Sequence, residues 1–128
     1  SMSSDGNNPP TLVIDYAENV SLLDFVAFSE HDERWNGWHA NDDLNQDRWQ
    51  LMRELVKAAY LPGKFVTFMG YEWSSMIWGH RSVILRRNDL DWCAASNKNQ
   101  NALYQCRDLQ ELFDFYGDDA LIIPHHSG

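Results

Sequence analysis

The segment that most constrains this chain is Leu22–Glu33, LLDFVAFSEHDE, in which an apolar run stops at four consecutive ionisable residues. The run is short and rich in aromatic and β-branched residues, so we predict a buried strand over residues 23–29 rather than a helix. The ionisable residues, Glu30–Glu33, follow at its carboxyl end. Because ligands of α/β proteins bind where parallel strands end, this strand end is the first candidate for a metal site.

The composition argues against several classes of partner. The chain has 128 residues, of which 44% are hydrophobic, enough for one domain with a modest core. Its formal net charge of -9 argues against nucleic acid and anionic membranes, since both attract clustered Lys and Arg. No stretch approaches the ~20 apolar residues of a membrane span. An acidic chain is compatible with a site for divalent cations. Ser1-Met2 resembles a remnant of expression, and the sequence leaves the compartment open.

The two cysteines, Cys93 and Cys106, allow two interpretations. They either form a disulfide across a polar loop or serve as ordinary small residues. Since two cysteines are too few to indicate a disulfide framework, we expect them to be unpaired.

Periodicity predicts an α/β order of elements. Apolar residues spaced by three and four positions predict three helices, over residues 10–20, 44–60 and 109–116. Short apolar runs predict three further strands, over residues 64–70, 81–86 and 120–124. Residues 34–43 are predicted to be a loop, and the polar stretch 87–106 a surface excursion. Without internal repeats or long linkers, residues 1–128 are predicted to form one α/β domain, a sheet or part of a barrel.

Three of the predicted strands end in side chains that bind metals: His31 after the first, Glu72 after the second, and His125 with His126 after the last. If these strands are parallel, the groups meet at one end of the sheet. His80 precedes its strand, but a hairpin after Glu72 would return it beside the carboxylate. Imidazole binds zinc, iron or manganese, and a carboxylate can bridge two cations. Adjacent strand residues point to opposite faces, so we expect only one of His125 and His126 to be a ligand.

Each of these residues also has an ordinary interpretation, as a hydrogen-bonded surface histidine, a solvated carboxylate or a turn cap. Their repeated placement at strand ends favours the metal site. His39 follows no predicted strand and is assigned to the surface or to substrate contact. Arg81 would bind an anionic substrate group or, more commonly, a carboxylate of the chain. Four tryptophans flank the candidate ligands and form either core packing or the wall of a substrate pocket: Trp35, Trp38, Trp73 and Trp78.

Five segments, in order, resemble motifs of the polymerase-and-histidinol-phosphatase (PHP) superfamily: SSDGNNPPTLVIDY at 3–16, LDFVAFSEHD at 23–32, GYEW at 70–73, GHRSVIL at 79–85 and IIPHHSG at 122–128. The resemblance implies part of a distorted (β/α)7 barrel with clustered divalent metal ions, either zinc, manganese or iron. It also implies a hydrolase, most similar to phosphoesterases, that cleaves a small-molecule phosphate ester with metal-activated water. By position, the implied metal ligands are His31, Glu72, His80 and His125, of which the first three are also catalytic. Asp5 would lie near the site.

The chain also departs from the family pattern. The family's His-x-His motif should precede residue 3, its Asp-x-His pair should follow residue 128, and Glu30 stands where the family has Asp. We therefore expect a barrel fragment truncated at both ends, whose open sheet edges favour a homo-oligomer. The alternative function is a non-catalytic, degenerate PHP-like module with a structural metal or none. Hydrolysis of a C–N or C–O bond is a third possibility.

Overall fold

A computed structural model describes residues 8–32, 44–95 and 102–126. These residues form a mixed α/β structure, as predicted, and they do not close into a barrel. The elements follow in chain order: α1 (Pro10–Asp15), the π-helical turn η1 (Tyr16–Val20), β1 (Phe25–Ala27), β2 (Glu30–His31), α2 (Gln46–Ala59), β3 (Val66–Phe68), β4 (Gly70–Trp73), β5 (Arg81–Leu85), β6 (Cys93–Ala94), β7 (Tyr104–Gln105), α3 (Leu109–Tyr116), the 3-10 turn η2 (Gly117–Asp119) and β8 (Ala120–Pro124).

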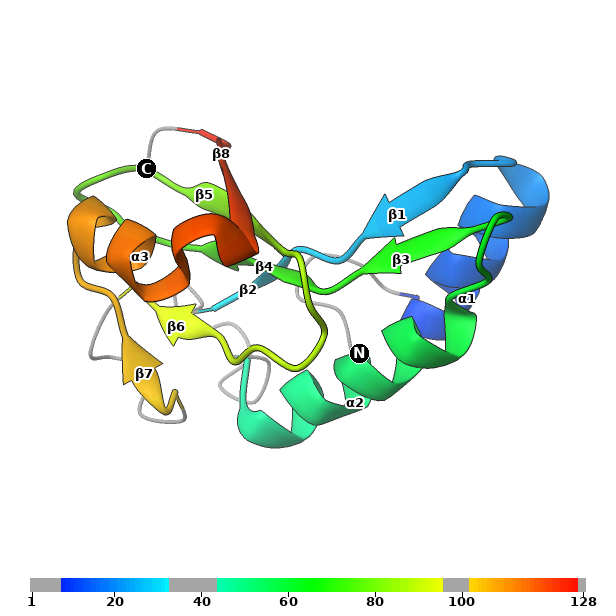
Figure 1. Ribbon diagram of the computed structural model, residues 1–128, viewed down its shortest axis with the longest axis horizontal. Coiled ribbons are helices and arrows are strands. Elements are labelled where there is room, and N and C mark those ends of the chain that lie inside the picture. The colour runs from blue at the N-terminus through cyan, green and yellow to red at the C-terminus, as the bar shows by residue number, and fades with distance from the viewer. Residues whose placement is uncertain (1–7, 33–43, 96–101, 127–128) are drawn as a thin grey trace.

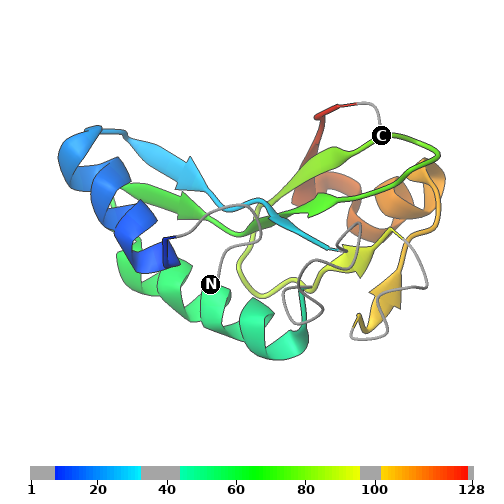
Figure 2. The ribbon, with the colours of Figure 1, turned by 180° about the vertical axis from the view of Figure 1, so that it is seen from behind.

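The helices begin and end close to their predicted bounds. Asn45 caps α2 by accepting a hydrogen bond from the Arg48 amide, and Asp108 caps α3 by accepting one from the Glu111 amide. Figures 1 and 2 show α1 and α2 beside β1 and β3 at one end of the molecule, and α3 beside β8 at the other. In the part of the chain that the structure describes, no helix has the length and apolar character needed to cross a membrane.

Two long parallel segments run through the middle of the molecule. β1 pairs with β3 and then, after a short break in both, β2 pairs with β4 in the same parallel sense (Figure 1). β4 continues into a hairpin with β5, and β8 pairs with the far side of β5, so the strand order is β2-β4-β5-β8. Because β5 is antiparallel to both neighbours, β2, β4 and β8 all end at the same edge of this sheet.

The first strand is less buried than its sequence predicts. Phe25 is 64% exposed, and Leu22 and Leu23 before it are also exposed. Among the described residues, β1 pairs only with β3, so it is an edge strand of a two-stranded sheet. Phe25 and Leu121 help to line an open apolar hollow of about 400 Å³. The apolar run therefore predicts the strand correctly, but not its burial.

The prediction that residues 87–106 form a surface excursion is wrong. Trp92 and Ala94 are fully buried, and Cys93 and Cys106 are buried as a disulfide, contrary to the expected unpaired cysteines. β6 and β7 form a short parallel pair beside that disulfide. The polar residues that suggested a surface loop, 97–101, lie outside the described residues. The disulfide thus supplies core contacts that hydrophobic patterning does not reveal.

Gly70 begins the strand that carries Glu72, and no larger residue fits there. A Cβ at this position would lie 2.5 Å from the Phe28 carbonyl oxygen and 2.7 Å from that of Val83. The Val83 oxygen belongs to β5 and the Phe28 oxygen to the segment between β1 and β2, so the backbone on both sides would have to separate to admit a methyl group.

We predict that Gly70→Ala lowers the free energy of unfolding by about 3 kcal/mol, the upper end of the usual cost of overpacking, because backbone atoms cannot turn away as side chains do. Urea denaturation followed by circular dichroism measures the change. Gly63→Asn is the control, since Gly63 has a φ of 75° with no atom within 4 Å of an added Cβ, and asparagine tolerates that conformation. Equal stability of wild type and Gly70→Ala would contradict the packing described here.

Candidate metal centre

Glu72 lies at the centre of a histidine cluster. It stands in β4, an interior strand of the sheet, and is only 3% exposed. His31, the last residue of β2, is its direct neighbour in the parallel pair. The β4–β5 hairpin returns His80 to the same face, and the end of β8 delivers His125 and His126. The shared strand direction and the hairpin on which the sequence argument depended are thus both confirmed.

The four imidazoles divide evenly between the two carboxylate oxygens. On one side, Oε1 lies 2.5 Å from Nδ1 of His80 and 3.6 Å from Nε2 of His126. On the other side, Oε2 lies 3.3 Å from Nε2 of His31 and 3.6 Å from Nε2 of His125. A buried carboxylate is costly unless cations or hydrogen-bond donors surround it. Here every nearby partner is a group that can donate a proton or bind a metal.

Both terminal histidines lie in the cluster, and the expectation that only one of them is a metal ligand stays a prediction. Donor atoms of Glu72, His125 and His126 all lie within 4.8 Å of one another, close enough to hold one metal ion. The ring of His126 also packs against His80, with centroids 4.3 Å apart. Strand alternation fails because the two residues follow Pro124, the last residue of β8. Their backbone pairs with His80 instead, through His125 N to His80 O and His80 N to His126 O.

The structure brings together all four predicted ligands and adds His126. Four other residues singled out from the sequence lie outside the described residues: Asp5, Trp35, Trp38 and His39. Trp73 is fully buried, and its indole donates to the Cys106 carbonyl at 2.9 Å, which bears out the core-packing interpretation for this residue.

Asp32 is a buried polar residue to which the sequence analysis assigned no role of its own. It is 0% exposed, and its carboxylate accepts hydrogen bonds from the amides of Ser74 at 2.8 Å and Ala95 at 2.6 Å. Its own amide donates to the Glu72 carbonyl at 3.0 Å. The only signal in the sequence was its place directly after His31, because both side-chain partners lie far away along the chain.

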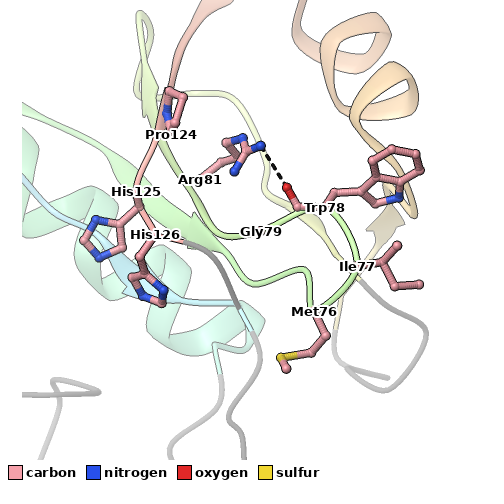
Figure 3. Close-up of a pocket in the computed structure, with 8 residues that line it drawn as sticks. All are labelled: Met76, Ile77, Trp78, Gly79, Arg81, Pro124, His125 and His126. Atoms are coloured by element: carbon pink, nitrogen blue, oxygen red, sulfur yellow. Dashed lines mark hydrogen bonds between the residues drawn. The ribbon is translucent and has the colours of Figure 1, made fainter.

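A pocket of about 480 Å³ lies between the turn after β4 and the end of β8 (Figure 3). Trp78 lines it and is 47% exposed. In Figure 3 the imidazoles of His125 and His126 point to one side of the chain, whereas Trp78 and Ile77 point to the other. His125 and His126 line this pocket as well, so it borders the histidine cluster directly.

Arg81 stabilises the turn that borders this pocket. Its guanidinium donates to the carbonyl oxygens of Trp78 and His80, each at 2.8 Å. Gly79 adopts a φ of 76°, and the Trp78 amide donates to Ser75 Oγ at 3.1 Å. The charge of Arg81 thus binds the main chain beside His80, which neither sequence interpretation anticipated.

A family model described as "Protein of unknown function (DUF3604)" matches residues 13–128. The chain belongs to the DUF3604 family. Searches of curated proteins and of solved structures find no match. The DUF3604 match spans the whole histidine cluster, from His31 to His126, as well as Asp32 and both cysteines. The cluster is therefore part of the DUF3604 domain itself.

We predict that Arg81→Met in this DUF3604 chain increases amide hydrogen exchange within residues 76–80 about tenfold, since the turn loses two charge-assisted hydrogen bonds. Hydrogen–deuterium exchange with mass spectrometry measures the rate. The matched control is Arg87→Met, because Arg87 pairs with the exposed carboxylates Asp89 and Asp119. Unchanged exchange in the Arg81 variant would contradict the role assigned to its guanidinium.

Proposed function

We propose that this DUF3604 chain forms the metal centre of a PHP-type hydrolase, and that the enzyme is a phosphoesterase. The observation that carries the proposal is the position of the Glu72 carboxylate, each oxygen of which faces two imidazole nitrogens. A carboxylate can bridge two cations, and imidazole suits zinc, manganese and iron. The even division of the four histidines between the two oxygens of Glu72 matches a carboxylate that bridges two cations.

The spacing of the donor atoms fits a bound cation. Two ligands at about 2.0–2.1 Å from one tetrahedral zinc ion lie about 3.4 Å apart. Separations of 3.3 and 3.6 Å join Glu72 to Nε2 of His31, His125 and His126. We include His80 in the ligand set because its Nδ1 contacts Oε1 of Glu72, the same oxygen that Nε2 of His126 approaches.

The chemistry of such a centre suits hydrolysis. A divalent cation held there would lower the pKa of a bound water and offset negative charge on a phosphate group. The protein contributes a rigid ligand set, since Glu72 and His31 belong to paired strands and His125 is hydrogen-bonded through its backbone to His80. The choice of a small-molecule phosphate ester rests on the resemblance of the segments around these residues to PHP motifs.

We also propose that the described strands are part of a PHP-type barrel. The parallel pairs β1–β3 and β2–β4, with α2 between β2 and β3 in the chain, support this topology. The apolar hollow that Phe25, Phe68 and Leu121 help to line supports it as well, because barrel interiors are filled by apolar side chains.

We predict that the purified protein contains at least one equivalent of zinc, manganese or iron, and that Glu72→Gln removes it, because a neutral amide is a poor ligand. Mass spectrometry of the metal content measures this. Glu111→Gln is the matched control, since Glu111 is a partly exposed glutamate of α3 that pairs with Arg107 and has no part in the cluster described above, and it should keep the metal.

The same three proteins decide whether the centre is catalytic. Wild type and Glu111→Gln should hydrolyse p-nitrophenyl phosphate, with a kcat/KM at least 100-fold above that of Glu72→Gln. A folded wild type that is metal-free even after incubation with zinc and manganese would contradict the metal centre. Metal binding without hydrolysis of phosphate, C–N or C–O substrates would instead identify a non-catalytic module.

A further inference from the structure

We propose that Asp32 is a positioning residue for the metal centre, and that the Cys93–Cys106 disulfide acts on the centre through it. The proposal rests on the metal centre proposed above. The hydrogen bonds of Asp32 hold together the three segments that follow β2, β4 and β6.

The first part of this connection fixes His31 against Glu72. The Asp32 amide donates to the Glu72 carbonyl, and Oδ1 of Asp32 accepts from the Ser74 amide. His31 directly precedes Asp32, and Ser74 follows Glu72 by two residues. The two hydrogen bonds therefore close a ring that sets the position of β2 along β4, and with it the position of the His31 imidazole relative to the carboxylate.

The second part joins this ring to the disulfide. Oδ2 of Asp32 accepts from the Ala95 amide at 2.6 Å, and Ala95 lies two residues after Cys93. Ala94, between them, accepts a hydrogen bond from the Cys106 amide. The closed disulfide thus keeps the Ala95 amide within hydrogen-bond distance of the buried Asp32 carboxylate.

The disulfide also supports the strand of Glu72 from the opposite face of the sheet. Tyr71 donates from its hydroxyl to the Cys93 carbonyl at 2.8 Å, and Trp73 donates from its indole to the Cys106 carbonyl. These two residues flank Glu72 in β4, so their side chains alternate with its own. Both half-cystines therefore accept hydrogen bonds from the two neighbours of Glu72, the residue that would bind the metal.

Three variants test the proposal, and isothermal titration calorimetry with Mn²⁺ measures the metal affinity of each. Asp32→Asn keeps the shape of the side chain but turns an NH₂ group toward one of two amide donors. The pair Cys93→Ala, Cys106→Ala removes the disulfide and leaves no thiols to bind the metal. We expect each change to weaken Mn²⁺ binding by about 10- to 100-fold, the usual effect of losing a group that orients a ligand. The protein that carries all three substitutions should bind Mn²⁺ with an affinity within about twofold of the weaker-binding of the two parent variants. Both changes act through the same contact between Asp32 and the Ala95 amide, so their effects should not add.

Thr67→Val is the matched control. Thr67 is buried, and its hydroxyl donates to the Val56 carbonyl, away from the cluster. It should lower the melting temperature as a lost buried hydrogen bond does, yet leave Mn²⁺ affinity unchanged within about twofold. The control separates a general loss of stability from a specific loss of ligand position.

The outcomes distinguish this inference from the proposed function. A wild type that does not bind Mn²⁺ would overturn both. A wild type that binds, with Asp32→Asn binding equally well, would overturn the positioning role alone. Additive losses in the combined variant would overturn the coupling through Asp32. If Asp32→Asn does not fold, the cysteine variant decides, and unchanged affinity in that folded protein would overturn the coupling.

Discussion

The rest of this structure depends on one buried negative charge. Glu72 lies on an interior strand of a four-stranded sheet and is almost inaccessible to water. A carboxylate in that position is unfavourable unless its surroundings compensate for the lost solvation. Four imidazoles provide that compensation, and the ends of β2 and β8 together with the β4–β5 hairpin deliver them. The topology of the sheet can be understood as the arrangement that brings these groups to one edge.

The two faces of β4 have different tasks. On one face, Glu72 meets the histidines. On the other, Tyr71 and Trp73 pack into the core and hydrogen-bond to the two half-cystines. Asp32 connects the two layers at the edge of the sheet, because its partners follow β4 and β6. A cluster of this kind needs a rigid support, since a ligand displaced by a fraction of an ångström binds a metal less well.

Much of the fold could be predicted from local pattern. Apolar spacing places the helices within two residues of their ends from Gln46 to Ala59 and from Leu109 to Tyr116, and apolar runs locate β5 and β8. Histidines after strands, together with the parallel direction of β2, β4 and β8, anticipated most of the cluster. These inferences hold because the type and extent of each element follow from sequence periodicity, whereas the parallel direction was an assumption that the sheet bears out.

The errors arose where a contact depends on residues far apart in the chain. The disulfide buries a segment whose composition is polar, so hydrophobicity predicted the wrong environment for residues 87–106. His126 joins the cluster because the chain leaves the regular strand after Pro124, and alternation does not apply there. Asp32 is held by amides 42 and 63 residues away, which no local pattern encodes. The exposure of Phe25 reflects the absence of a covering element among the described residues, not a property of the strand itself.

The central claim is that the Glu72 carboxylate binds a divalent cation together with the histidines around it. Anomalous diffraction at the zinc absorption edge, from crystals grown with zinc, tests it most directly. The account predicts an anomalous peak about 2.0–2.2 Å from a Glu72 carboxylate oxygen, with imidazole nitrogens of at least two of the four histidines at the same range. Zinc bound only elsewhere, with Glu72 still held by its hydrogen bond to His80, would contradict it.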